Sequence, residues 1–174
     1  MLVCSLPRCG ATKYCLDLQK TTGLKFAGEL NPIHIGDDRK SLVHETRYQP
    51  SYTSSDFAEL LHDHSNHIVL VNQGSYLLIN QADVIVLRKD MRDAALSLAK
   101  FLIMMYPQIK PSSIIHQLKL MHYDYIGVIS YLNKYSKDII WYEDYYNMTG
   151  TDTSLLESYP GKDNIMREID AYYR

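Results

Sequence analysis

Residues 2–14 join a short apolar run to a helix-like segment through a turn that carries a proline and a glycine. The run from Leu2 to Leu6 has the length of a buried strand, and Pro7 and Gly10 mark the turn. At such a junction the loop N–H groups and the positive end of the helix dipole converge on one point, where a phosphate or sulfate can bind. The junction therefore predicts an anion-binding loop, with an ordinary strand-to-helix turn as the alternative.

Other apolar segments follow the same alternation of strand-like and helix-like patterns. Continuous apolar runs at 68–71 and 82–87 have the length of strands buried on both faces. Shorter strands are expected at 24–27 and 138–141. Helices are expected at about 12–20, 53–61, 112–136 and 163–173. With 174 residues the chain fits one domain, 1–174, that is large enough to bury a single core.

Composition excludes several classes of function. The formal net charge is -2, so there is no general basic field for a nucleic acid or an anionic membrane. No apolar run is long enough to cross a bilayer, and Met1 leads into the first strand without the pattern of a signal peptide. Cysteines at 4, 9 and 15 lack the spacing of a disulfide framework or zinc site. A cytoplasmic protein is expected, without nucleic-acid or membrane partners.

The loop shares part of the nucleotide-kinase motif G-x-x-x-x-G-K-[ST] but lacks its lysine. The positions that correspond to the motif's marked places are Ser5, Gly10, Ala11 and Thr12. Alanine stands where a kinase needs lysine, which argues against a P-loop kinase. Cations are present instead at Arg8 and Lys13. A cysteine phosphatase is also set aside, because neither Cys4 nor Cys9 has an arginine six positions later.

Residues 7–12, Pro-Arg-Cys-Gly-Ala-Thr, resemble the P-[RK]-S-G-T-[TS] loop of sulfotransferases. In that family the loop grips the 5′-phosphosulfate end of 3′-phosphoadenosine-5′-phosphosulfate (PAPS). The resemblance implies a set of cofactor-binding residues in the loop: Arg8, Cys9, Gly10, Ala11, Thr12 and Lys13. Cys9 replaces the family's serine, and its thiol is either unusually acidic at a helix start or a space-filling group.

A second segment resembles the same family more specifically. Residues 91–97, Met-Arg-Asp-Ala-Ala-Leu-Ser, reproduce the latter part of the sulfotransferase pattern R-x-P-R-D-A-x-x-S, which follows a strand. The first arginine and the final serine of that pattern bind the cofactor's 3′-phosphate. Ser97 takes the serine position. Arg88 is preferred for the arginine because a planar guanidinium suits bidentate phosphate binding, although the family spacing falls on Lys89.

A third segment, Tyr142-Glu-Asp-Tyr145, follows an apolar strand and resembles the family's Y-E-D-L element. The resemblance implies that Tyr142 lies near the adenine; a buried core aromatic is the alternative. The family's glycine-rich basic segment near the C-terminus is not recognisable, and Lys162 is the cation present at the corresponding turn.

Together, the resemblance of these three segments to sulfotransferases implies a three-layer, P-loop-like α/β fold with a central parallel sheet flanked by helices. The same resemblance implies an enzyme that uses PAPS as co-substrate, needs no metal, and transfers a sulfuryl group to the hydroxyl or amine of a small-molecule or glycan acceptor. The alternative is a non-catalytic adenosine bisphosphate-binding or scaffold protein of the same fold. Arg8 is expected to neutralise charge on the sulfuryl group in the transition state.

The general base is expected to be Glu29, in the turn after the second strand, as in some branches of the family. A turn carboxylate bonded to nearby backbone is the alternative role, and His34, His44 and His67 are alternative bases. The polar stretch 33–52 is expected to be a loop that faces the acceptor substrate or a plain surface loop. Histidines at 62, 64 and 67 suggest a solvated helix end more than a metal site.

Overall fold

The computed structural model describes residues 1–30, 66–148 and 150–173. Its centre is a parallel sheet in the order β2-β3-β1-β4-β5, which confirms the α/β class. The strands are β1 (Leu2–Ser5), β2 (Lys25–Leu30), β3 (His67–Val71), β4 (Val84–Leu87) and β5 (Ile139–Trp141). The expectation for the second strand, 24–27, was too short. Glu29 therefore belongs to β2 rather than to a turn after it.

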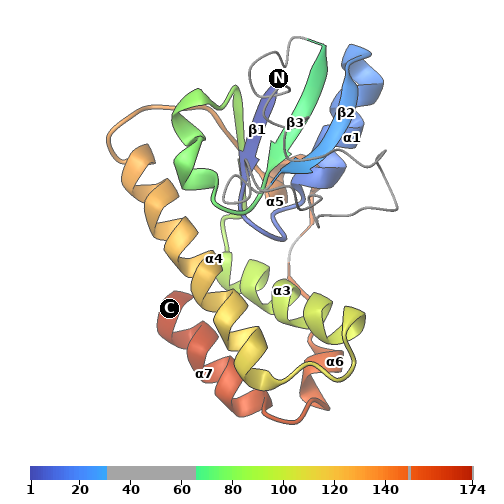
Figure 1. Ribbon diagram of the computed structural model, residues 1–174, viewed down its shortest axis with the longest axis vertical. Coiled ribbons are helices and arrows are strands. Elements are labelled where there is room, and N and C mark those ends of the chain that lie inside the picture. Colours follow the sequence, from blue (N-terminus) through green and yellow to red (C-terminus); the bar gives the residue numbers. More distant parts are fainter. Residues whose placement is uncertain (31–65, 149, 174) are drawn as a thin grey trace, which may run out of the picture.

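The helices gather on both faces of the sheet and beyond the ends of its strands (Figure 1). They are α1 (Ala11–Thr22), α3 (Met91–Met105), α4 (Pro111–Leu132), α5 (Tyr142–Tyr146), α6 (Ser154–Glu157) and α7 (Lys162–Tyr173), with 3₁₀ turns η2 (Ser75–Leu77) and η3 (Ile79–Gln81). The long helix expected at 112–136 ends earlier, at Leu132. Within the described part of the chain, no helix combines the length and hydropathy needed to cross a membrane.

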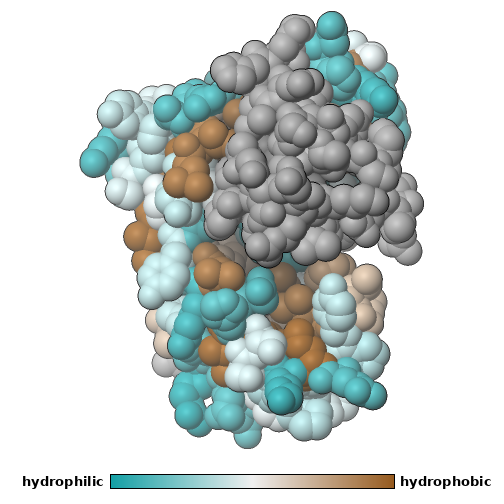
Figure 2. Space-filling model, in the orientation of Figure 1, coloured by the Kyte–Doolittle hydropathy of each residue, from teal (hydrophilic) through white to brown (hydrophobic). Residues whose placement is uncertain are grey.

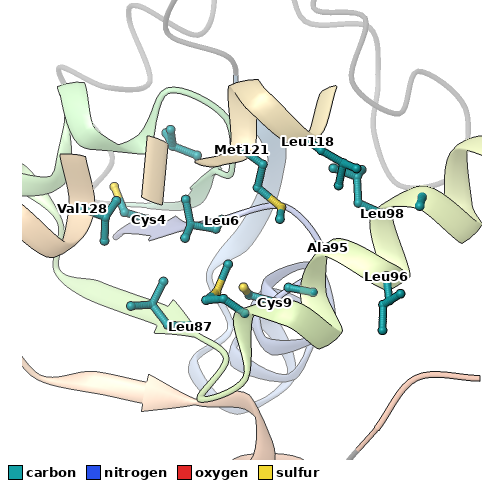
Figure 3. Packing of buried hydrophobic residues seen from close by; sticks show 14 of the residues in the cluster. Cys4, Leu6, Cys9, Leu87, Ala95, Leu96, Leu98, Leu118, Met121 and Val128 are labelled. Carbon is teal, nitrogen blue, oxygen red and sulfur yellow. The ribbon is translucent and has the colours of Figure 1, made fainter. Parts of the chain in front are cut away.

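Alternate strand residues serve two separate apolar layers. Val3, Leu70 and Val86 face α1, where they pack with Tyr14 and Cys15. The residues between them face the opposite layer, which includes α3 and α4 (Figure 3). This second group consists of Leu2, Cys4, Val69, Val71, Ile85 and Leu87. Because both faces of the strands are covered, the arrangement is compatible with a three-layer α/β fold.

Local signals set the helix boundaries. Asp90 caps α3 by accepting hydrogen bonds from the backbone N–H groups of Arg92 (2.9 Å) and Asp93 (3.2 Å). Gly23 ends α1 in the left-handed region, with φ 74°. Pro111 occupies the first turn of α4, where a missing N–H costs no helical hydrogen bond.

The helix α4 contacts the connection after β3 through a buried carboxylate. Asp124 accepts hydrogen bonds from the backbone N–H groups of Ser75 (3.2 Å) and Tyr76 (3.0 Å). One turn later, a Cβ added to Gly127 would lie 2.6 Å from the Cβ of Tyr76, so the two elements approach closely. Burial raises the pKa of Asp124 above its ordinary value of 3.8, although these N–H donors act in the opposite sense.

Hydrophilic and hydrophobic side chains are interspersed over the helical end of the molecule on the face seen in Figure 2. Exposed apolar residues of α4 include Leu120, Tyr123 and Ile126. Exposure of single apolar residues is usual on protein surfaces.

Candidate functional site

The loop between β1 and α1 is shaped by two left-handed residues. Arg8 has φ 65° and Gly10 has φ 78°, and the N–H of Cys9 donates to the carbonyl of Leu6 at 3.3 Å to close the turn. The helix then begins at Ala11, and no side chain in the described residues caps its N-terminus. The first-turn N–H groups and the positive end of α1 therefore lie at the carboxyl end of the central strand, where anions bind in open α/β sheets.

Two tyrosines of α5 pack against this loop. A Cβ added to Gly10 would lie 2.3 Å from Cδ2 of Tyr142 and 3.2 Å from Cε2 of Tyr146. The Tyr146 hydroxyl donates to the carbonyl of Gly10 at 3.4 Å, and the Lys13 ammonium lies 4.0 Å from the centre of the Tyr146 ring. Glycine is therefore required at position 10 by its backbone conformation and by the approach of Tyr142.

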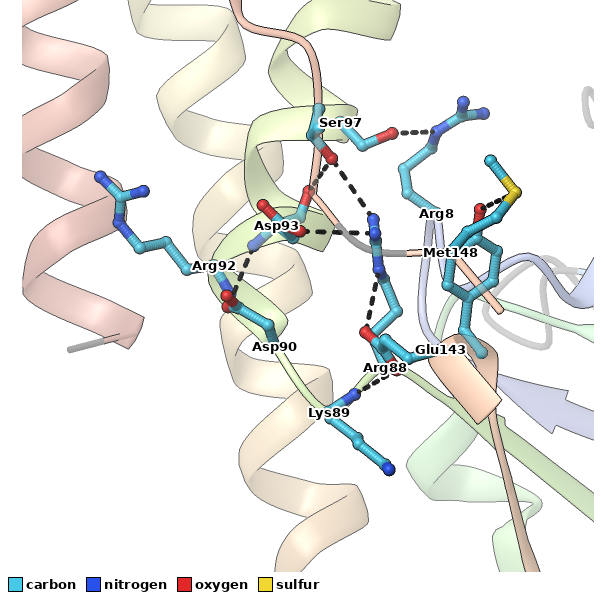
Figure 4. Close-up of polar contacts among 11 residues, drawn as sticks. Arg8, Arg88, Lys89, Asp90, Arg92, Asp93, Ser97, Glu143 and Met148 are labelled. Atoms are coloured by element: carbon cyan, nitrogen blue, oxygen red, sulfur yellow. Dashed lines mark hydrogen bonds and ion pairs between the residues drawn. The ribbon is translucent and has the colours of Figure 1, made fainter. Parts of the chain in front are cut away.

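Arg8 extends from the loop to α3 (Figure 4). Its Nε donates to Oγ of Ser97 at 3.2 Å, and its guanidinium lies 4.7 Å from the centre of the Phe101 ring. Desolvation lowers the pKa of Arg8; the charge of Glu29 opposes this shift and the charge of Arg88 adds to it. Two motif residues that are 89 positions apart in the sequence are thus in direct contact.

Arg88 occupies a buried position between β4, α3 and α5. Its side chain lies 3.6 Å from the carboxylate of Asp93 and 3.5 Å from that of Glu143. Its guanidinium also lies 4.6 Å from the centre of the Tyr142 ring and donates to Thr151 at 3.5 Å. With only 5% of Arg88 exposed, its charge is met by protein carboxylates.

Arg88, or alternatively Lys89, was predicted to lie beside Ser97 at a phosphate site. The observed hydrogen bond to Ser97 comes instead from Arg8. Lys89 is exposed and its ammonium lies 2.5 Å from the carboxylate of Asp144. The physical reason is that Glu143 and Asp144, which follow β5, are adjacent to the end of β4 and attract both cations.

A β-bulge determines where Glu29 points. In the pairing of β2 with β3, Phe26 lies opposite Ile68 and Gly28 opposite Val69, so Ala27 is an extra residue. Gly28 has φ 112°, a conformation that other residues rarely adopt. Without the extra residue, Glu29 would pair with the residue after Leu70 and point away from α1. With it, Glu29 pairs with Leu70, and its side chain lies on the α1 face.

Glu29 accepts hydrogen bonds from two neighbouring elements. The hydroxyl of Thr12, in the first turn of α1, donates to its Oε1. The side-chain amide of Asn72, directly after β3, donates to its Oε2 at 2.7 Å. Glu29 is 5% exposed. The expected turn carboxylate is therefore a buried group beside the loop, and Asn72 is a residue that the sequence analysis missed, since a single asparagine after a strand carries no motif.

The remaining loop side chains face different environments. Cys9 and Ala11 are buried, so only their backbones can face a ligand, whereas Lys13 is exposed. Burial raises the pKa of the Cys9 thiol to about 12. The alternative of an acidic thiol at position 9 is therefore wrong, because loss of hydration outweighs the opposing effects of nearby backbone groups and of the Arg88 charge, and the sulfur fills space in the core.

The other predicted bases are not all within the described residues. His34 and His44, the stretch 33–52, and the histidines at 62 and 64 lie outside them. His67 begins β3, opposite Lys25 at the amino edge of the sheet, whereas the loop lies at the carboxyl edge. Within residues 1–30, 66–148 and 150–173, no group of three His, Cys, Asp or Glu side chains is arranged to hold a metal ion.

The sequence matches no protein-family model and no curated protein. Chemically, the described residues combine a loop at the N-terminus of α1, an exposed arginine hydrogen-bonded to a serine, an aromatic ring beside the loop, and a buried carboxylate that accepts a hydrogen bond from the first turn of α1.

Proposed function

We propose that this protein is a PAPS-dependent sulfotransferase with a P-loop-like α/β fold. The observation that carries the proposal is the Arg8–Ser97 hydrogen bond of 3.2 Å, because it joins two segments that separately resemble the sulfotransferase cofactor site. The sheet order, with β1 at the centre and the loop directly after it, supports a P-loop-like class.

In this proposal the loop binds the 5′-phosphosulfate of PAPS through the first-turn N–H groups of α1. Ser97 binds the 3′-phosphate together with Arg8, because the hydrogen bond between them favours this role for Arg8 over the role expected at the sulfuryl group. Arg8 is exposed and can turn toward a ligand. Tyr142 lies beside the adenine, with one side of its ring held by the buried Arg88. Arg88 is then a positioning residue, since Asp93 and Glu143 already meet its charge.

The transfer itself requires positioning and charge stabilisation. The acceptor's oxygen or nitrogen attacks the sulfur in line, the S–O bond to the 5′-phosphate breaks, and adenosine 3′,5′-bisphosphate leaves. The acceptor's proton passes to the carboxylate of Glu29. The loop N–H groups and Lys13 stabilise negative charge on the leaving phosphate. The acceptor class proposed is a hydroxyl or amine of a small molecule or glycan.

Radiolabelled PAPS tests the proposal, with release or transfer of labelled sulfate as the measurement. Arg8→Ala is expected to reduce turnover at least about tenfold, the loss typical of a hydrogen bond to a charged group. Lys20→Ala is the matched control, because Lys20 carries the same charge at the opposite end of α1 and pairs with Asp17. Equal turnover by wild type and Arg8→Ala would exclude the role of Arg8.

A second candidate is a non-catalytic adenosine bisphosphate-binding or scaffold protein. It is favoured by the burial of Arg88, which leaves fewer exposed cations for the donor than the motif implied. Thermal-shift measurements with PAPS, adenosine 3′,5′-bisphosphate, ATP and AMP separate the cases. Stabilisation by the first two without sulfate release supports the second candidate, and stabilisation only by ATP with magnesium contradicts both.

A further inference from the structure

Three elements contribute one chain of hydrogen bonds beside the loop. Thr12 from α1 donates to Oε1 of Glu29 in β2, and Asn72 at the end of β3 donates to Oε2 at 2.7 Å. The resemblance to sulfotransferases assigned separate roles to Thr12 and Glu29. Because Thr12 donates a hydrogen bond to Glu29, any change in the hydrogen bonding of the Thr12 hydroxyl also changes the hydrogen bonding of the Glu29 carboxylate.

Thr12 has a single hydroxyl proton, and in the structure that proton is donated to Glu29. The same residue lies in the first turn of α1, where the backbone N–H groups would hold an anion. The hydroxyl cannot donate to Glu29 and to a bound anion at the same time. Binding an anion that takes this proton therefore removes one hydrogen bond from Oε1.

We propose that Thr12 is a switch that couples anion binding at the loop to the basicity of the Glu29 carboxylate. When a phosphate or sulfate group binds, the Thr12 hydroxyl turns from Oε1 of Glu29 to an oxygen of the anion. A hydrogen bond to a carboxylate stabilises its charged form, so its loss makes Glu29 a better proton acceptor. This inference deepens the proposed function and rests on it for the identity of the anion.

Asn72 holds the Glu29 carboxylate in place. Its amide holds Oε2, so the carboxylate keeps its orientation when Thr12 turns away. The bulge at Ala27 and Gly28 has the same effect on the backbone, because it fixes Glu29 on the α1 face of the sheet. Only the Thr12 hydroxyl then has to rotate, a change of one side-chain torsion.

Calorimetric titration of adenosine 3′,5′-bisphosphate into a double-mutant cycle of Thr12→Val and Glu29→Gln tests the coupling. In wild type the ligand must compete with Glu29 for the hydroxyl, so Glu29→Gln is expected to tighten binding. Part of that gain reflects the removal of a negative charge and persists in the Thr12→Val background. The part due to the hydroxyl, roughly threefold to tenfold, is expected to disappear there.

Thr12→Ser is the matched control, because it keeps a hydroxyl and should restore the full effect of Glu29→Gln. Thr12→Ala replaces Thr12→Val if the latter does not fold, as judged by circular dichroism. The same fold-change from Glu29→Gln with and without the hydroxyl would overturn the coupling.

Failure of the proposed function gives a different result. If the bisphosphate does not bind wild type, the donor is wrong, and the same cycle is measured with inorganic sulfate. A hydroxyl-dependent effect on sulfate binding then supports the coupling without the sulfotransferase assignment. Equal fold-changes for sulfate, or no sulfate binding, would overturn the coupling as well.

Discussion

Gly10→Ala is the substitution whose cost follows most directly from the geometry of the loop. An alanine there must adopt φ near 78°, which costs about 1–2 kcal/mol for a residue with a Cβ. Its Cβ would also meet the Tyr142 ring at 2.3 Å, so the ring must move, and such overpacking costs about 1–3 kcal/mol. We expect a loss of roughly 3 kcal/mol in the free energy of unfolding.

Gly23→Ala is the control, at the other end of the same helix. Gly23 has a similar φ of 74°, and nothing lies within 4 Å of an added Cβ. Its loss should be about 1 kcal/mol. In a chain of this length these losses lower the melting temperature by about 6–12 °C for Gly10→Ala and about 2–4 °C for Gly23→Ala.

Urea unfolding followed by far-UV circular dichroism measures both losses. In a Tyr142→Ala background, the difference between the two glycine variants should fall below about 1 kcal/mol, because the clash is relieved. Equal losses for both variants in the wild-type background would refute the packing of Tyr142 on the loop.

Three further predictions concern buried groups. Burial raises the pKa of Cys4 and Cys9 to about 12 and also raises that of Cys15. Iodoacetamide at pH 8 should therefore label none of these thiols in the native protein and all of them in urea. Rapid labelling of the native protein would contradict their burial. Burial raises the pKa of Asp124 in the folded protein, so the folded protein keeps a proton on Asp124 at pH values where the unfolded chain has lost it. The free energy of unfolding of wild type, relative to that of Asp124→Asn, should therefore fall as pH rises from about 4. Urea titrations between pH 4 and 7 measure this difference, and a rise with pH would refute the raised pKa. Arg88→Met should cost about 3–5 kcal/mol, because Asp93 and Glu143 lose their buried partner, whereas a loss below about 1 kcal/mol in urea unfolding would contradict that role.

The sequence was informative where the pattern was long or continuous. The apolar run 68–71 predicted β3 to within one residue, and the run 82–87 contains β4, which begins two residues later at Val84; a strand covered on both faces must be apolar throughout. Pro7 and Gly10 located the loop, because proline and glycine favour turns and Gly10 adopts a left-handed conformation with φ 78°. The segment containing Ser97 was placed correctly on a helix that begins after the fourth strand.

Contacts between distant segments were harder to anticipate. The partner of Ser97 is Arg8, because Arg88 is attracted instead to Asp93 and Glu143, a competition that spacing along the chain does not express. The acidic Cys9 thiol was wrong for a related reason, since the burial of one side chain depends on the packing of several elements. The bulge before Glu29 adds one residue to a strand and leaves the hydrophobic pattern nearly unchanged.

Calorimetric comparison of adenosine 3′,5′-bisphosphate with AMP is the most direct test of the proposed donor site. The two ligands differ by the 3′-phosphate, which Arg8 and Ser97 are proposed to bind together. We expect the bisphosphate to bind wild type at least about tenfold more tightly than AMP, and Arg8→Ala and Ser97→Ala to remove most of that difference without additive effects. Equal affinities for the two ligands, or a preference that survives both substitutions, would contradict the site.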